Sequence, residues 1–205
     1  VYSSLMPKFS RPLTDNDRRG WKPHRKMKQW YDYNLIHNGI KLISNDKQKA
    51  EILIEYSLIN DSAKVKVKYT VYSNGVIKVD YALNLKPGLP NIPKIGMQME
   101  IDSSFKQIEY FGRGPFENYI DKNYGADVGI YNQNIFDFME NYVVPQENGN
   151  RTGVRWMYLH NQQSKDGLLV VADSLLSMSA WPYTEENIQN AKHTNKLKEA
   201  GFITL

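Results

Sequence analysis

The chain has 205 residues, of which 41% are hydrophobic and 23% are charged, and it contains no cysteine. This composition is that of a globular protein, and it excludes a disordered or fibrous chain, a disulfide framework and a thiolate metal site or nucleophile. The net charge of +4 is interspersed along the sequence, so we expect no nucleic-acid partner, even at the basic stretch 17–28.

The stretch 22–36 is the first candidate helix. Pro23 suits a first helical turn, because the N–H that proline lacks is one that a helix start leaves without an intrahelical partner. Met27, Trp30 and Tyr31 fall on one face at helical spacing. We therefore expect one short helix in this stretch.

Strand-like alternation dominates the rest of the chain. Asn74-Gly75 separates two alternating runs and is the strongest short hairpin signal, so it predicts an antiparallel meander there. The stretch 161–167 is expected to be the loop of a second hairpin. The predicted strands are 50–59, 64–72, 76–85, 95–102, 106–112, 154–160, 167–173 and 176–181.

A second short helix is expected over 184–193, with Thr184 as its N-cap and acidic residues in its first turn. Many strands, two short helices and no alternation of strands with helices predict an all-β fold, a large antiparallel sandwich. We see no internal repeat or linker. The prediction is therefore a single β-sandwich domain over 1–205.

Motifs for chemistry are absent. No nucleophile elbow, His-Glu-x-x-His run or phosphate-cradling glycine loop occurs, and the 4 histidines are scattered, so we predict no metal site in this chain. Glu117 and Glu147 could form the paired carboxylates of a glycosidase, but sequence spacing does not show their separation. Each lies among turn-forming polar residues, which favours a structural role.

The two ends and the hydropathy bear on the size and location of the protein. The chain begins at Val1 rather than Met and ends in the apolar run GFITL, so we interpret it as a fragment of a longer protein. No apolar run approaches the roughly 18 to 20 residues that a membrane span needs, so no membrane partner is expected. The compartment stays open between cytoplasm and periplasm.

Four long motifs resemble the C-terminal region of the large β-galactosidases of glycoside hydrolase family 2. They are KFSRPLTDNDRRGW (8–21), YFGRGPFENYIDKNYGADVGIY (110–131), PQENGNRTGVRW (145–156) and PYTEENIQNAKHT (182–194). Their order and spacing are similar to the family's and cover nearly the whole chain. The sequence departs from the family's usual residues at Phe116, Lys122 and Gly153.

The resemblance implies a galactose mutarotase-like supersandwich, the last domain of a multidomain enzyme, truncated before its final strands. It implies that the full enzyme hydrolyses terminal non-reducing β-D-galactose residues with retention. The two catalytic glutamates would lie in a (β/α)₈ barrel upstream, so no catalytic residue and no cofactor are expected in this chain. Mg and Na are expected in the full enzyme, bound mainly elsewhere. The expected partners are the other domains of the polypeptide, above all the barrel, the β-galactoside substrate and, in a homo-oligomer, further copies.

Two polar clusters are expected to be structural. We predict that side-chain amides and a guanidinium satisfy backbone groups at a sheet corner formed by Gln146, Glu147, Asn148, Asn150 and Arg151. A second corner is expected at Arg113, Glu117, Asn118, Tyr119 and Asp121, with an ion pair between Arg113 and Asp121.

Two further stretches are candidates for contact with the substrate pocket. In the resembling enzymes the segment that holds Arg11, Asp15, Asn16 and Asp17 runs close to the barrel, and its carboxylates and amides suit sugar hydroxyls or a cation. A chain of turns that links domains is the other interpretation. The turn with Asn60 and Asp61 matches a loop that borders the pocket in the family.

Two functions of other classes stay open. The 14 Tyr and 4 Trp residues could stack on sugar rings in a carbohydrate-binding module, although aromatic residues at alternating strand positions are typical of a core. An aldose 1-epimerase shares the expected fold, but no recognisable epimerase motif occurs. The apolar end also leads us to expect an unpaired strand edge at Phe202–Leu205, through which the isolated chain would self-associate.

Overall fold

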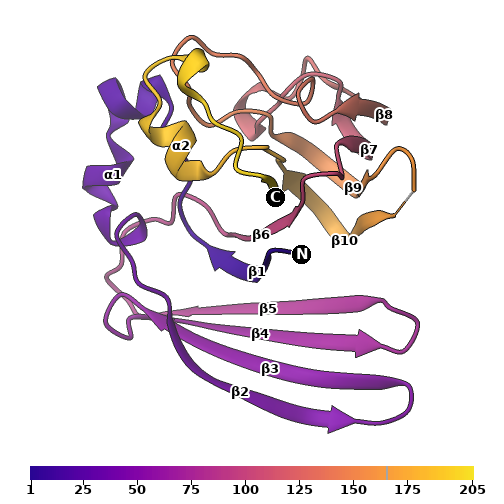
Figure 1. Cartoon of the computed structure of the whole chain (residues 1–205). Helices are drawn as coiled ribbons and strands as arrows, with labels where there is room; N and C mark the ends of the chain where they lie inside the picture. The colour runs from indigo at the N-terminus through magenta and orange to yellow at the C-terminus, as the bar shows by residue number, and fades with distance from the viewer. Residues whose placement is uncertain (165) are drawn as a thin grey trace. The chain divides into compact units, whose positions relative to one another are not determined.

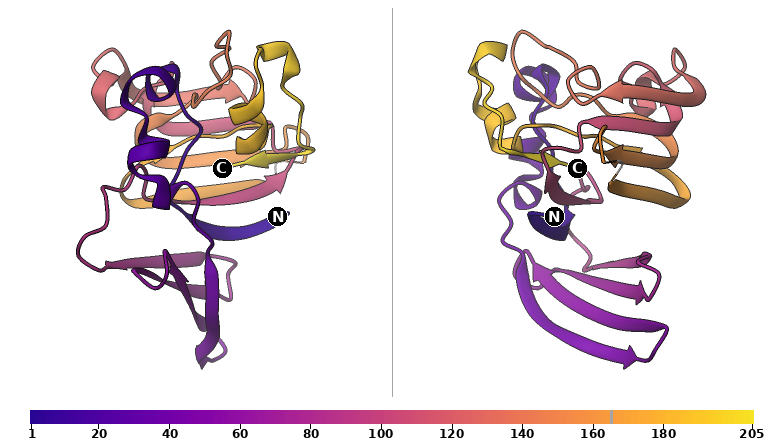
Figure 2. Two further views of the ribbon diagram at one scale, coloured as in Figure 1. Left: turned by 90° about the vertical axis from the view of Figure 1, so that its left-hand side faces the viewer. Right: turned by 45° about the vertical axis from the view of Figure 1, so that its right-hand side comes forward.

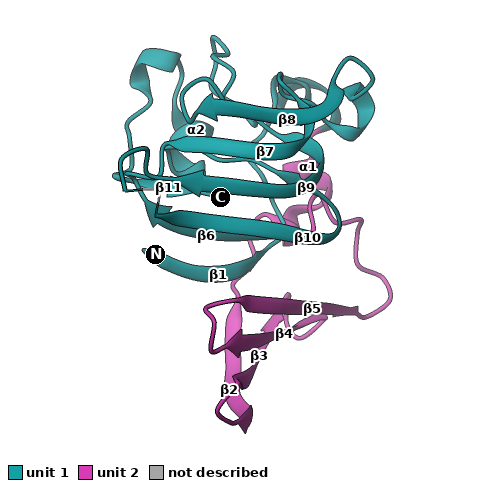
Figure 3. Ribbon diagram, turned by 90° about the vertical axis from the view of Figure 1, so that its right-hand side faces the viewer, with its two compact units in different colours: residues 1–21, 96–205 teal, residues 22–95 magenta. Residues whose placement is uncertain are grey.

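The computed structural model describes residues 1–164 and 166–205. The chain divides into two compact units, coloured separately in Figure 3. Unit 1 comprises Val1–Trp21 and Gly96–Leu205, and unit 2 comprises Lys22–Ile95. The single domain over 1–205 stays a prediction. In the part of the chain that the structure describes, every helix is too short or too polar to cross a membrane.

The described residues form an all-β fold with antiparallel pairing throughout, as predicted (Figure 1). Its helical segments are short. The elements in chain order are β1 (Ser3–Lys8), η1 (Asp17–Trp21), α1 (Pro23–Lys26), η2 (Lys28–Trp30), β2 (Ile36–Asn45), β3 (Lys49–Leu58), β4 (Ala63–Tyr72), β5 (Ile77–Leu85), β6 (Gly96–Asp102), β7 (Gln107–Gly114), η3 (Ile120–Lys122), β8 (Asp127–Asn134), β9 (Arg151–His160), β10 (Gly167–Met178), α2 (Glu185–Asn190), η4 (Thr194–Lys196) and β11 (Phe202–Thr204).

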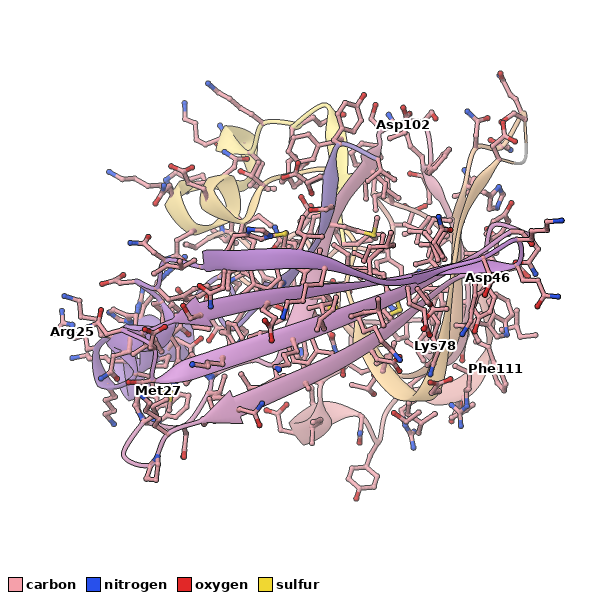
Figure 4. The ribbon with its side chains drawn as sticks, turned by 90° about the horizontal axis from the view of Figure 1, so that it is seen from below. Arg25, Met27, Asp46, Lys78, Asp102 and Phe111 are labelled. Carbon is pink, nitrogen blue, oxygen red and sulfur yellow. The ribbon has the colours of Figure 1, made fainter. Side chains whose placement is uncertain are left out.

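Unit 2 contains the predicted meander, extended by one strand to the order β2-β3-β4-β5. Gly75 adopts a left-handed φ of 88° in the turn between β4 and β5, which confirms the Asn-Gly hairpin. Along β4, Val65 and Val67 are buried and the lysines between and beside them are exposed or half-buried, as the alternation requires. Figure 4 shows this sheet with its side chains, with Lys78 on β5 and Asp46 in the turn before β3.

The helix predicted over 22–36 is too long. Pro23 does begin a helix, but α1 ends at Lys26, and after η2 the chain has entered β2 by Ile36. Met27 leaves the helical region with φ −122° and ψ 34°, and the buried Trp30 donates its indole N–H to the carbonyl of Pro90 at 2.9 Å. A contact of this kind with a distant part of the chain overrides a local helical pattern. The strands β1, β2 and β8 are further differences, because the predicted set contains no strand over their residues.

Unit 1 contains two sheets, with the strand orders β10-β9-β7-β8 and β1-β6-β11. Side chains from both sheets enter one apolar core, in which Ile101 and Ile203 from the smaller sheet join residues of the larger one. The buried residues of this core are Ile101, Ile108, Tyr110, Ile135, Phe138, Val154, Met157, Leu159, Ala180 and Ile203. Unit 1 is thus a sandwich of two sheets around a shared core.

The last strand of the larger sheet in chain order, β10, differs from the prediction. The strands predicted over 167–173 and 176–181 are one strand, β10, which ends at Met178. Its register with β9 shifts between Val171 and Leu176, so an irregularity replaces the expected break. The hairpin between β9 and β10 is confirmed, and residue 165 of its loop lies outside the described residues.

The predicted unpaired edge at Phe202–Leu205 is present only in part, because β11 is the last strand of its sheet but has a bridge partner beyond it at Thr204. β11 pairs with β6 on one side, and on its other side Thr204 exchanges two backbone hydrogen bonds with Trp181, both of 2.8 Å. Leu205 adds two more bonds to Met99. This edge therefore has no free ladder positions at Thr204 to recruit a second copy.

Candidate functional site

The loop that leads into β9 carries polar side chains that are almost fully removed from water. Glu147, Asn148, Asn150 and Arg151 are all buried, although polar residues of these types mostly lie at the surface. A buried polar group costs free energy unless it is hydrogen-bonded. The contacts of these side chains therefore show what this cluster, residues 146–152, does.

Side-chain amides connect this loop to the turn after β7. The Nδ2 group of Asn150 donates to the carbonyl of Asn118 at 2.7 Å, and the amide N–H of Asn118 donates to the carbonyl of Asn150 at 2.8 Å. The side chain of Asn118 donates to the carbonyls of Arg113 and Phe116, and its oxygen accepts from the N–H of Thr152 at 2.9 Å. The two predicted corners are thus one network.

Arg151 extends the network into the apolar core. Its side chain donates to the Tyr110 hydroxyl at 3.1 Å, to Gln133 Oε1 at 3.2 Å and to the carbonyls of Gly149 and Asn150. These acceptors are neutral oxygens. Burial raises the pKa of Tyr110, and the Arg151 charge opposes that rise. Arg151 therefore holds four polar groups in place.

Glu117 is bound from three sides. Its side chain is 6% exposed and accepts from Lys122 Nζ at 2.5 Å, from the amide of Gly149 at 2.9 Å and from the Tyr142 hydroxyl. Burial alone would lower the pKa of Lys122, but the hydrogen bond and charge of Glu117 raise it. Burial, and then the charges of Glu147 and Glu117, raises the pKa of Tyr119.

The expected ion pair between Arg113 and Asp121 is wrong. Arg113 donates to the backbone carbonyl of Ala126 at 2.9 Å and to that of Asn123 at 3.4 Å, whereas Asp121 is exposed. The carbonyls of the turn before β8 lie within reach of the guanidinium and accept its hydrogen bonds without the cost of fixing an exposed carboxylate. The ion pair in this corner is that of Lys122 with Glu117.

The first candidate segment for substrate contact, residues 11–17, is held in a defined conformation. Arg11 forms an ion pair of 2.7 Å with the buried Asp17. Asp17 Oδ2 also accepts from the amide of Thr14 at 3.0 Å, and Thr14 Oγ1 accepts from the amide of Asp17 at 3.2 Å. Asn16 is exposed, and the side chain of Asp15 is 43% exposed.

The second candidate turn lies in unit 2. Ile59, Asn60 and Asp61 are consecutive residues with positive φ, at 54°, 49° and 59°. Asn and Asp tolerate this left-handed region, whereas a β-branched residue there is strained. Asn60 and Asp61 are exposed at the end of the β3–β4 hairpin. Arg11, Asp15, Asn16 and Asp17 belong to unit 1.

Sequence reasoning missed the contacts that join segment 11–18 to distant parts of unit 1. Gln189 Oε1 accepts from the amide of Leu13 at 2.7 Å, and Gln146 Oε1 accepts from the amide of Asp15 at 2.9 Å. Arg18 donates to the carbonyls of Pro145 and Gln189. Figure 2 shows the yellow segment of α2 beside the indigo segment that precedes η1. No local pattern marks Gln189 as a partner of Leu13.

The chemistry available to this site is limited by its hydrogen bonds. Both oxygens of Glu117 accept from other groups and the side chain is 6% exposed, so this carboxylate is turned toward its neighbours and away from solvent. Across residues 1–164 and 166–205, three or more His, Cys, Asp or Glu residues do not gather as metal ligands would. The hydrogen bonds of this network are those of a structural support, which holds the loop before β9 and the turn after β7.

Known proteins are similar to the whole chain. The family model of the β-galactosidase small chain matches residues 1–205. A β-galactosidase of Priestia megaterium is 32% identical over 99% of the chain, and one of Halalkalibacterium halodurans is 29% identical over 98%. A β-galactosidase of Streptococcus thermophilus is 32% identical over 94% of it. The chain spans about one fifth of the length of these relatives, 20%, 20% and 19%.

Proposed function

This chain belongs to the β-galactosidase small-chain family, and we propose that it is a non-catalytic domain of an enzyme that hydrolyses terminal non-reducing β-D-galactose residues. The proposal is supported by the relatives, which are named β-galactosidases and are about five times as long as the part that matches.

The observation that carries the non-catalytic role is the coordination of Glu117. A general acid or a nucleophile must come within reach of the glycosidic bond of a bound substrate, whereas the Glu117 side chain is only 6% exposed. The oxygens of Glu117 instead accept from Lys122, Gly149 and Tyr142, and these bonds hold two loops together. The two carboxylates of a retaining mechanism would come from the catalytic barrel elsewhere in the polypeptide, as would most ligands of Mg²⁺ and Na⁺.

In this proposal the domain contributes to the substrate pocket through exposed polar side chains. In unit 1, Asp15 and Asn16 lie between Thr14 and Asp17, whose hydrogen bonds fix the backbone. Asn60 and Asp61 of unit 2 are a separate proposed contact, and they follow Ile59, whose β-branched side chain makes its φ of 54° strained. Residues in such backbone regions cluster at functional sites, which is the reason for proposing this turn. Arg11 and Asp17 support the first of these stretches through their ion pair.

The full-length enzyme and the chain 1–205 should be compared with o-nitrophenyl β-D-galactoside as substrate. We expect hydrolysis by the full-length enzyme and none by the chain alone. Proton NMR of the first product should show β-galactose, because two displacements at the anomeric carbon retain its configuration. First-formed α-galactose would contradict retention, and turnover by the chain alone would contradict the non-catalytic role.

A further inference from the structure

Segment 11–18 depends on two glutamine side chains that lie far from it in the sequence. The amide N–H groups of Leu13 and Asp15 point away from any regular ladder and donate to Gln189 and Gln146. Leu13 is buried, so its N–H needs an acceptor from the protein. These two bonds fix the backbone immediately before Asn16.

Gln189 contacts the segment at both of its ends. Its side-chain oxygen accepts from Leu13 at 2.7 Å, and its backbone carbonyl accepts from Arg18 at 3.3 Å. Arg18 also donates to the carbonyl of Pro145 and lies 3.7 Å from an oxygen of Asp15. Gln189 therefore holds the stretch 13–18 by hydrogen bonds at its first residue and at its last residue.

The helix that carries Gln189 is itself fixed. The side chain of Thr184 accepts from the amide of Asn187 at 3.0 Å and caps the N-terminus of α2. Ile188 is completely buried in a cluster with Met139 and Trp181. A helix of 6 residues is not stable alone, so this packing keeps α2 in place.

We infer that Gln189 is a positioning residue, which holds segment 11–18 in the conformation that presents Asp15 and Asn16 to the galactoside. The inference rests on the proposed function, in which these two side chains border the substrate pocket. Gln189 acts through the backbone of Leu13, so its loss should affect substrate binding more than the chemical step. The amide oxygen alone carries this role, because it is the atom that accepts the hydrogen bond.

Three variants of the full-length enzyme test the inference. Gln189→Leu removes the acceptor while keeping a similar volume, and we expect about a ten-fold rise in KM with kcat changed less than about two-fold, because a buried N–H is left without a partner. Gln189→Glu keeps an acceptor oxygen and should restore KM to within about two-fold of the parent. Gln163→Leu, in an exposed turn, is the matched control and should leave KM unchanged.

A second readout does not depend on activity. Limited trypsin digestion followed by mass spectrometry should show cleavage after Arg18 or Arg19 about five-fold faster in Gln189→Leu than in the parent, with Gln189→Glu near the parent, because the segment opens more often when an anchor is lost. A lower melting temperature with unchanged KM and unchanged cleavage would overturn the positioning role. Faster cleavage with unchanged KM would overturn the link to substrate. A parent enzyme without hydrolytic activity would instead contradict the proposed function.

Discussion

The guanidinium carbon of Arg151 lies 4.1 Å from the centroid of the Phe138 ring, and both side chains are fully buried. A planar guanidinium stacks on an aromatic face while its edges remain available to hydrogen-bond acceptors. Arg151 uses this property to join the apolar core of unit 1 to the polar loop before β9. The contacts of Arg151 therefore stabilise the loop and the core together.

Arg151→Ala should lower the melting temperature of the chain by several degrees. The change leaves the acceptors on Gly149, Asn150 and Gln133 without their donor and opens a cavity beside Phe138. Differential scanning calorimetry measures the effect, with the exposed Arg19→Ala as control. Equal melting temperatures for the parent and Arg151→Ala would contradict the structural role of this side chain.

Glu117→Gln should destabilise the domain by about 1 to 3 kcal/mol, because the negative charge that pairs with Lys122 and one of the two acceptor oxygens are lost. In the full-length enzyme kcat should stay within a few-fold of the parent, and the same holds for Glu147→Gln. Urea unfolding measures the change in stability, and initial-rate kinetics measure kcat. A fall in kcat of about a thousand-fold would identify a catalytic carboxylate instead.

The buried hydroxyl of Tyr119 should make the protein less stable at alkaline pH. Its pKa is raised in the folded state by burial and by Glu147 and Glu117, so the neutral hydroxyl is favoured by folding. This contribution is complete below the unfolded pKa of about 10 and is lost as the pH rises above it. Between pH 8 and pH 11, the free energy of unfolding measured with urea should fall less for Tyr119→Phe than for the parent. The exposed Tyr124→Phe should behave as the parent does, and a Tyr119→Phe loss equal to the parent's would refute the prediction.

Asp15→Asn and Asp61→Asn should each raise KM of the full-length enzyme by about three- to ten-fold if their carboxylates accept hydrogen bonds from sugar hydroxyls. Asparagine tolerates the left-handed φ of 59° at position 61, so the backbone there is preserved. Asp127→Asn, on the exposed edge strand β8, is the control. Kinetics indistinguishable from the parent would remove the substituted residue from the pocket.

The sequence predicted those parts of the fold that depend on neighbours in the chain. The strands β3, β4 and β5, the turn at Asn74-Gly75 and the N-cap at Thr184 were predicted from local features, and the structure confirms them. The pairing of β1 with β6, in which Met6 lies opposite Gln98, and the hydrogen bond between Leu13 and Gln189 depend on partners distant in the sequence, which no local pattern specifies.

The polar cluster shows the same limit at the level of single side chains. That the amides at Asn148 and Asn150 would satisfy backbone groups follows from their chemistry and turn context, and such bonds are present. The sequence did not identify the hydrogen-bond acceptors of Arg113. They are two backbone carbonyls before β8 rather than the carboxylate of Asp121. Choices of this kind depend on distances that exist only in the folded chain.

The most direct test of the central claim is to locate the catalytic nucleophile of the full-length enzyme. A 2-deoxy-2-fluoro β-galactoside with a good leaving group should trap the covalent glycosyl-enzyme of a retaining glycosidase, and mass spectrometry of its peptides identifies the labelled residue. The non-catalytic role predicts a label on a glutamate outside residues 1–205. A label on Glu117, Glu147 or any other residue of this chain would contradict it.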